Sequence, residues 1–155
     1  MKYWLMKSEP NDYCLDDLKK DKKILWTGVR NFQARNFMIH EMSVGDLAFF
    51  YNSNGEPSGI TGVIKISRPA TADPTQFDPK SMYYEAKARP EKAVWECVEV
   101  SYQETFAKIV SLAELKSLKG IENMEVLKRG SRLSIQPVRK NEFDRIMKHV
   151  KASKK

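Results

Sequence analysis

The chain has 155 residues, of which 41% are hydrophobic and 30% charged, and its formal net charge is +7 with an isoelectric point near 9.4. These values are typical of one globular domain and exclude a membrane-spanning protein, because no apolar run approaches the ~20 residues of a span. The first residues lack the pattern of a signal peptide, and the basic excess fits a polyanionic partner such as a nucleic acid.

The first third of the sequence predicts strands and helices in alternation. Apolar and aromatic residues predict strands over 3–7 and 47–52 and a return to the core over 24–26. A short helix is expected over 13–20. A longer helix is expected over 30–42, where apolar residues recur at the spacing of a buried stripe.

The rest of the sequence predicts further strands with short helices between them. The expected elements are strands over 60–67, 95–102, 106–110 and 133–138 and helices over 111–118 and 140–150. Gly62 lies inside a predicted strand and indicates a bulge or a close backbone approach. Residues 68–94 are rich in proline but also contain Phe77, Tyr83 and Tyr84, so we expect a long ordered excursion rather than a linker.

This pattern favours an α+β fold, namely a mixed, mostly antiparallel β-barrel flanked by short helices. The sequence shows no internal repeat and no domain boundary. We therefore expect one domain over 1–150, followed by a basic C-terminal tail over 151–155.

The residues that common enzyme and metal sites require do not cluster in the sequence. Cys14 and Cys97 lie far apart, as do His40 and His149, so we expect no metal site and two packed thiols in a reducing compartment. The sequence has no P-loop, no dinucleotide fingerprint and no nucleophile elbow. We expect no catalytic residue, no metal and no cofactor.

Three segments combine aromatic side chains with hydroxyl, amide and basic groups: 7–10, 26–36 and 51–54. A nucleobase pocket needs such groups, because a π surface stacks on the base, amides and hydroxyls bind its edge, and cations bind the flanking phosphates. Trp26 and the polar run that follows it supply all three. The alternative is that Trp26 belongs to the core and the amides cap turns, and the residues alone leave both interpretations open. Segments 77–84 and 130–134 are suggestive in the same way.

The sequence resembles the EVE domain family over almost the whole chain. The similarity is carried by 3–10, 26–37 and 130–138, with further agreement at 49–54 and 73–78. The resemblance implies a PUA-like fold, shared with YTH, SRA and ASCH domains, and it implies recognition of a modified cytosine, methylated or hydroxymethylated, in DNA. The sequence is also distantly similar to YTH domains, in which a Lys-Ser pair and a tryptophan lie at the positions of Lys7, Ser8 and Trp26, and that tryptophan helps to cage an N-methylated adenine.

These resemblances imply a specific set of site residues. The expected base pocket comprises Lys7, Ser8, Trp26, Val29, Asn31, Gln33, Tyr51, Asn52 and Ser53. Trp26 is expected to form its wall, and Arg30, Arg35 and Arg132 are expected to contact phosphates. The sequence departs from the family at Thr27, where relatives commonly have Asp, and at Asn52, where they have His. At Arg139, where many relatives have Thr, the cap of the last helix is not evident from the sequence.

Two other functions stay open on the sequence alone. One is an RNA-binding or RNA-modification-associated PUA-like domain, although DNA is the more expected partner. The other is an enzyme acting on a nucleobase or nucleotide, for which Glu9 is the one acid we can nominate. We expect a monomer without membrane contact in the cytoplasm, or in the nucleus of a eukaryote, acting with a separate effector protein.

Overall fold

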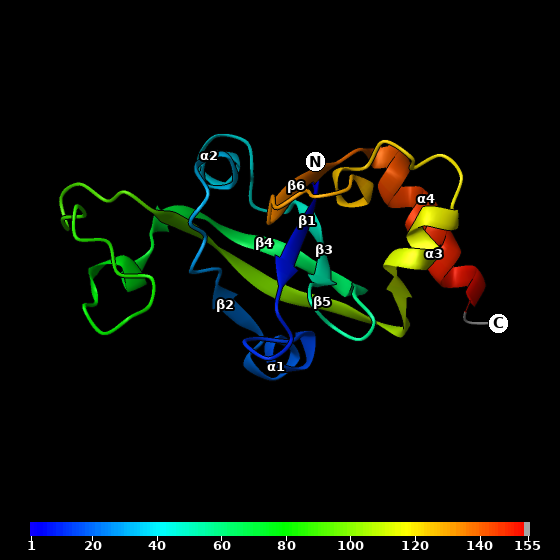
Figure 1. The fold of residues 1–155 in the computed structure, drawn as a ribbon, viewed down its shortest axis with the longest axis horizontal. Helices are drawn as coiled ribbons and strands as arrows, with labels where there is room; N and C mark the ends of the chain where they lie inside the picture. The colour runs from blue at the N-terminus through cyan, green and yellow to red at the C-terminus, as the bar shows by residue number, and fades with distance from the viewer. Residues whose placement is uncertain (154–155) are drawn as a thin grey trace.

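A six-stranded sheet runs through the molecule and carries four α-helices (Figure 1). The computed structural model describes residues 1–153. The strand order is β2–β5–β4–β3–β1–β6, and the strands are β1 (Tyr3–Ser8), β2 (Lys23–Leu25), β3 (Leu47–Asn52), β4 (Gly59–Ala72), β5 (Glu96–Ser111) and β6 (Ile135–Val138). Only β1 and β3 pair in parallel; the other neighbours are antiparallel. The predicted α+β class with a mixed, mostly antiparallel sheet is confirmed. The sheet begins at β2 and ends at β6 without closing into a full barrel.

The helices divide between the two faces of the sheet. They are α1 (Leu15–Asp21), α2 (Phe32–His40), α3 (Leu112–Ser117) and α4 (Lys140–Ser153), with short 3₁₀ turns η1 (Pro74–Phe77) and η2 (Glu125–Leu127). Buried residues of α1 and α2 belong to one hydrophobic cluster, and those of α3, α4 and η2 belong to a second. Figure 1 shows α3 and α4 together at one end of the sheet, away from α1 and α2.

Alternation along the central strands builds these two clusters. Trp4 and Phe50 point into the first cluster, while Leu5, Phe49 and Tyr51 point into the second. Successive side chains of a strand face opposite sides of a sheet, so a strand buried on both faces contains a continuous apolar run.

The β4–β5 ribbon is longer than predicted. β4 continues to Ala72, and β5 is unbroken from Glu96 to Ser111, where the sequence suggested two separate strands. Several register shifts let these long strands bend without losing their pairing. One of them lies next to Gly62, where an added Cβ would collide with the carbonyl oxygen of Glu104, so the predicted close approach is confirmed.

The excursion between these strands forms the tip of the ribbon (Figure 1). The buried amide of Gln76 organises it. Its Nε2 donates to the carbonyls of Asp73 (2.8 Å) and Trp95 (2.7 Å), and its Oε1 accepts from the backbone N–H groups of Val94 and Trp95. The predicted ordered excursion is therefore confirmed.

The last helix starts at Lys140, as predicted, but ends three residues later than predicted. Glu142 accepts a hydrogen bond from the backbone N–H of Arg139 at 2.8 Å, which caps a helix start that the sequence left unexplained. The helix runs to Ser153 and so includes residues 151–153 of the predicted tail, while Lys154 and Lys155 lie outside the described residues. Within residues 1–153, no helix has the length and hydrophobicity needed to cross a bilayer.

Candidate nucleic-acid interface

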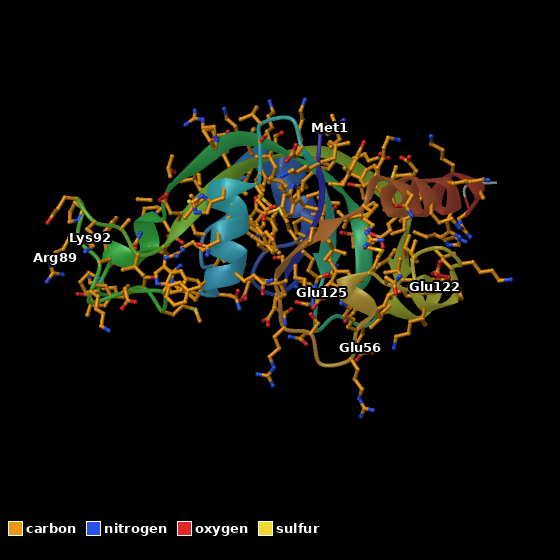
Figure 2. All side chains as sticks on the ribbon, turned by 90° about the horizontal axis from the view of Figure 1, so that it is seen from above. Met1, Glu56, Arg89, Lys92, Glu122 and Glu125 are labelled. Carbon is orange, nitrogen blue, oxygen red and sulfur yellow. The ribbon has the colours of Figure 1, made fainter. Side chains whose placement is uncertain are left out.

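A groove of about 550 Å³ lies beside the edge strand β6. One wall comes from α2, and the other comes from η2 and the loop that follows it; Glu125 of that second wall is labelled in Figure 2. The lining residues are Asn31, Gln33, Phe37, Asn123, Met124, Glu125, Lys128, Ser131, Arg132, Leu133, Pro137, Val138, Arg139 and Glu142. Their mixture of apolar, amide and basic side chains suits a ligand with a flat apolar part and an anionic backbone.

The α2 wall is built by a helix cap. Asn31 has an extended backbone, and its Oδ1 accepts a hydrogen bond from the N–H of Ala34 at 2.9 Å, which starts the helix at Phe32. Gln33 and Phe37 are one helical turn apart and share the face that lines the groove. The polar segment identified in the sequence thus both caps a helix and lines the groove.

The opposite wall is held by Glu125. Its carboxylate accepts a hydrogen bond from Ser131 Oγ at 2.8 Å and pairs with Lys128 Nζ at 3.2 Å. The hydrogen bonds from Ser131 and Lys128 lower the pKa of Glu125. Arg132, next along the loop, is exposed, and no ion pair within residues 1–153 engages it, so its charge faces solvent at the groove.

The end of β1 is joined to this loop. The backbone N–H of Lys7 donates to the carbonyl of Ser134 at 2.9 Å. The Lys7 ammonium lies 5.9 Å from the centre of the Tyr51 ring. Burial lowers the pKa of Lys7, and the nearby charge of Glu125 opposes that shift in part. Lys7 is therefore a half-buried cation close to the groove wall.

Asn52 carries an unsatisfied buried acceptor. It pairs in register with Ser8, whose hydroxyl donates to the carbonyl of Tyr13 at 2.7 Å. The Oδ1 of Asn52 is the single buried side-chain nitrogen or oxygen within residues 1–153 that has no hydrogen-bond partner. Asn52 also lines a cavity of about 180 Å³ with Cys14 and Thr61, separate from the groove. An unpaired buried acceptor costs about 1–3 kcal/mol, and a donor supplied by a ligand would offset that cost.

A model of the EVE domain family matches residues 2–149 of the chain. The chain belongs to the EVE domain family. Thymocyte nuclear protein 1 of Danio rerio is 39% identical to this EVE domain over 163 residues, covering 93% of the chain and 70% of the relative. The human protein of that name is 37% identical, over 94% of the chain and 72% of its own length.

Solved structures of EVE relatives superpose over the whole fold. Human THYN1 in complex with DNA containing 5-methylcytosine has a TM-score of 0.89 at 36% identity, over 97% of this chain and 98% of that one. A hypothetical protein from Leishmania major has a TM-score of 0.95 at 39% identity, over 100% and 98%. An ASCH protein from Zymomonas mobilis, at 9% identity and a TM-score of 0.55, shares the fold alone.

Strand alternation separates the predicted pocket residues of this EVE domain. Lys7 and Tyr51 lie on the face of the second hydrophobic cluster, whereas Trp26 and Val29 belong to the first cluster. Ser53, beyond the end of β3, donates its backbone N–H to the carbonyl of Ser8. Trp26 is 8% exposed and meets the Phe50 ring edge-on at 5.7 Å and 84°. Its ring is thus packed in the core in this structure, and its predicted contact with a base stays a prediction.

Arg30 is engaged within the EVE fold. Its guanidinium donates to Asp73 (3.1 Å), Thr75 (3.1 Å) and the carbonyl of Tyr83 (2.7 Å), and it lies between the rings of Tyr83 and Trp95. A guanidinium whose donors are already used has little left for a phosphate. The predicted phosphate contact stays a prediction, while the structure gives Arg30 a positioning role.

The structure thus brings Asn31, Gln33 and Arg132 together at the groove. Sequence analysis missed Glu125 and Glu142, which have no distinctive spacing, and the basic run that ends at Arg132 was the one signal that could have identified Lys128. Within residues 1–153, no group of three or more His, Cys, Asp or Glu side chains is placed to hold a metal ion.

Proposed function

We propose that this chain binds DNA and recognises a single extruded cytosine that carries a methyl group. The observation that carries the proposal is the complex of human THYN1 with 5-methylcytosine DNA, a protein of the same family and fold. The polar and basic groove beside β6 supports it, because its residue types match a base edge and flanking phosphates.

The free energy of binding an extruded base must come from more than one kind of contact. Extruding a base costs a few kcal/mol, and stacking returns ~1–3 kcal/mol per base. Contacts with phosphates must supply the remainder, and in this proposal Arg132 and Lys128 make them from the groove wall. A methyl group that fills a pocket discriminates by ~1–3 kcal/mol, which corresponds to a preference of roughly 5- to 150-fold.

The base edge is assigned to two amides, Asn31 in the groove and Asn52 in the separate cavity beside Cys14. Asn31 uses its oxygen for the helix cap, so its amide N–H₂ is the group we assign to the ligand. The unpaired Oδ1 of Asn52 suits the exocyclic amine of cytosine, which is a hydrogen-bond donor. Trp26 stacks on the base in this proposal only if binding uncovers its ring, because the ring is packed against Phe50.

We infer that the chain is a binding module rather than an enzyme. Glu9, the acid nominated from the sequence, is exposed and accepts a hydrogen bond from Asn54 Nδ2 at 3.0 Å, and it does not line the groove. A Glu9→Gln variant should therefore bind methylated DNA like the wild type. Product formation from any nucleic-acid substrate, lost in that variant, would overturn this inference. A monomeric state, a separate effector and a cytoplasmic location stay predictions.

The test is fluorescence-polarisation binding to paired duplexes that contain cytosine or 5-methylcytosine at one position. We expect the wild type to prefer the methylated duplex, and we expect Arg132→Ala to weaken binding to both and to lower the slope of log K against log salt by about 0.9. Lys116→Ala on α3 removes the same charge at an exposed site outside the groove and should leave the slope of groove binding near that of the wild type. Matched RNA strands separate the RNA alternative, since only RNA offers the 2′-hydroxyl.

Equal affinity for methylated and unmethylated DNA would contradict the proposed recognition. Equal loss in Arg132→Ala and Lys116→Ala would mean that general charge, not the groove, holds the nucleic acid. Tighter binding to the matched RNA strands would show that the partner is RNA and not DNA.

A further inference from the structure

Phe32 is an exposed aromatic residue held in a fixed orientation. It is the first residue of α2, and 58% of it is exposed. Its ring stacks on Trp95 with centroids 4.8 Å apart and planes 21° from parallel. A single exposed apolar residue is ordinary, but one that is fixed by stacking on a buried tryptophan presents a rigid π surface to solvent.

The guanidinium of Arg35 lies close to both rings of this stack. Arg35 Cζ is 4.7 Å from the centre of Phe32 and 6.0 Å from the centre of Trp95. If Arg35 covered the face opposite Trp95, its distance to Trp95 would be about twice 4.7 Å. The outer face of Phe32 is therefore not covered by Arg35. Hydrogen bonds to the carbonyl of Val94 (2.9 Å) and to Asn36 Oδ1 (3.0 and 3.2 Å) hold Arg35 in place, and they leave two of its five guanidinium N–H groups free for a phosphate.

The start of α2 links this surface to the groove, although Phe32 is not itself a lining residue. Asn31 and Gln33, the neighbours of Phe32 in sequence, both line the groove, and the exposed Arg132 lies on its opposite wall. A nucleic acid bound in the groove would therefore pass next to Phe32. The combination of an open aromatic face and a nearby cation is complementary to a nucleobase and its phosphate.

We propose that the outer face of Phe32 stacks on a nucleobase that flanks the extruded one, while Arg35 contacts the adjoining phosphate. This inference rests on the proposed function and extends it from one base to two neighbouring nucleotides. The flanking base must lose one of its own stacking neighbours when the methylated base leaves the duplex, and Phe32 replaces that neighbour. Because every base has a π face, this contact adds affinity without strong sequence preference.

The experiment is a double-mutant cycle in which one change is made in the protein and the other in the DNA. Affinities of wild type and Phe32→Ala are measured for 5-methylcytosine duplexes in which the 5′ flanking base, the 3′ flanking base or neither is replaced by an abasic site. We expect Phe32→Ala to weaken binding to the intact duplex by roughly 5- to 150-fold, from a stacking contribution of ~1–3 kcal/mol. The loss should vanish for one of the two abasic duplexes, and Phe32→Tyr should restore most of the affinity.

Two controls separate stacking from a structural effect. Val44→Ala truncates an apolar residue of 59% exposure in a different loop and should bind like the wild type. Thermal unfolding followed by circular dichroism should show that Phe32→Ala folds. An equal loss on all three duplexes, or no loss on any, would overturn the stacking contact. Failure of the proposed function looks different, because the wild type would then not distinguish methylated from unmethylated duplexes, whatever residue 32 is.

Discussion

The carboxylate of Asp73 and the guanidinium of Arg30 meet at 3.1 Å and join the tip of the β4–β5 ribbon to the segment that leads into α2. Asp73 is fully buried, and it also accepts hydrogen bonds from the backbone N–H groups of Gly28 and Thr75, each at 2.8 Å. The pair therefore fixes the excursion against the start of the groove wall at Asn31.

Removing Asp73 should leave Arg30 without its partner in a largely buried site. Breaking a buried ion pair from one side costs about 3 kcal/mol, so we expect Asp73→Ala to lower the free energy of unfolding by that amount. Urea unfolding followed by tryptophan fluorescence measures the difference. A change below about 0.5 kcal/mol would mean that the pair does not hold the excursion.

The same pair predicts a pH dependence. Burial raises the pKa of Asp73, but hydrogen bonds from Thr75, Gly28 and Arg30 outweigh it, so the folded-state pKa is lowered. A lowered pKa stabilises the folded state above the unfolded-state pKa of about 3.9, and this contribution disappears as the pH falls through the folded-state value. The stability difference between wild type and Asp73→Ala should thus be constant from pH 7 to about 5 and shrink in acid. A difference that grows in acid would contradict this assignment.

Gly28 is predicted to be intolerant of any side chain. Its φ of +85° is unfavourable for other residues, and an added Cβ would lie 2.8 Å from the Tyr83 ring. We expect Gly28→Ala to cost about 2 kcal/mol, from backbone strain and displacement of Tyr83. Gly45→Ala is the matched control, because Gly45 has a φ of +100° and no atom within 4 Å of the added carbon, so it reports the backbone strain alone. Equal costs at the two positions would show that Tyr83 moves freely.

The amide side chains of Gln76 and Asn52 should respond differently to truncation. Gln76 makes four hydrogen bonds, whereas Asn52 Oδ1 makes none. We expect Gln76→Ala to lower stability by about 3 kcal/mol and Asn52→Ala to leave it within about 0.5 kcal/mol of the wild type. If Asn52 binds the cytosine amine, Asn52→Ala should also weaken DNA binding, as fluorescence polarisation would show. Wild-type affinity in that variant would remove Asn52 from the base site.

The two thiols should differ in reactivity. Cys97 is buried, and burial raises its pKa to about 12, so almost none of it is thiolate at pH 8. Cys14 is only half-buried, at the start of α1. Titration with a chromogenic disulfide at pH 8 should therefore label one thiol in the folded protein and both in denaturant. Rapid labelling of Cys97 in the native state would contradict the complete burial of its side chain.

Local sequence patterns predicted most helices and strands, because apolar periodicity and helix caps depend on residues only a few positions apart. The strand over 47–52 and the Ser111 cap of α3 follow from such signals. The length of β4 and β5 does not follow from local signals, since bulged pairing between residues 24 to 52 positions apart sustains these strands through Pro69 and several polar residues.

The site was harder to predict for a physical reason. Adjacent residues such as Lys7 and Ser8 look like one cluster in sequence, but strand alternation sends them to opposite faces. Arginine is a common phosphate ligand, yet the guanidinium of Arg30 pairs with Asp73, more than 40 residues away in the sequence. Such partners are set by the fold and leave no local signal.

One binding measurement tests recognition of an extruded methylated base most directly. It compares the affinity of the wild type for four duplexes, in which cytosine or 5-methylcytosine lies opposite either guanine or an abasic site. Extruding a base costs a few kcal/mol, and removing its pairing partner removes part of that cost, so we predict tighter binding opposite the abasic site. We also predict a methyl preference of roughly 5- to 150-fold in both contexts. The same affinity for all four duplexes would show that the protein holds only the DNA backbone, and would contradict the account.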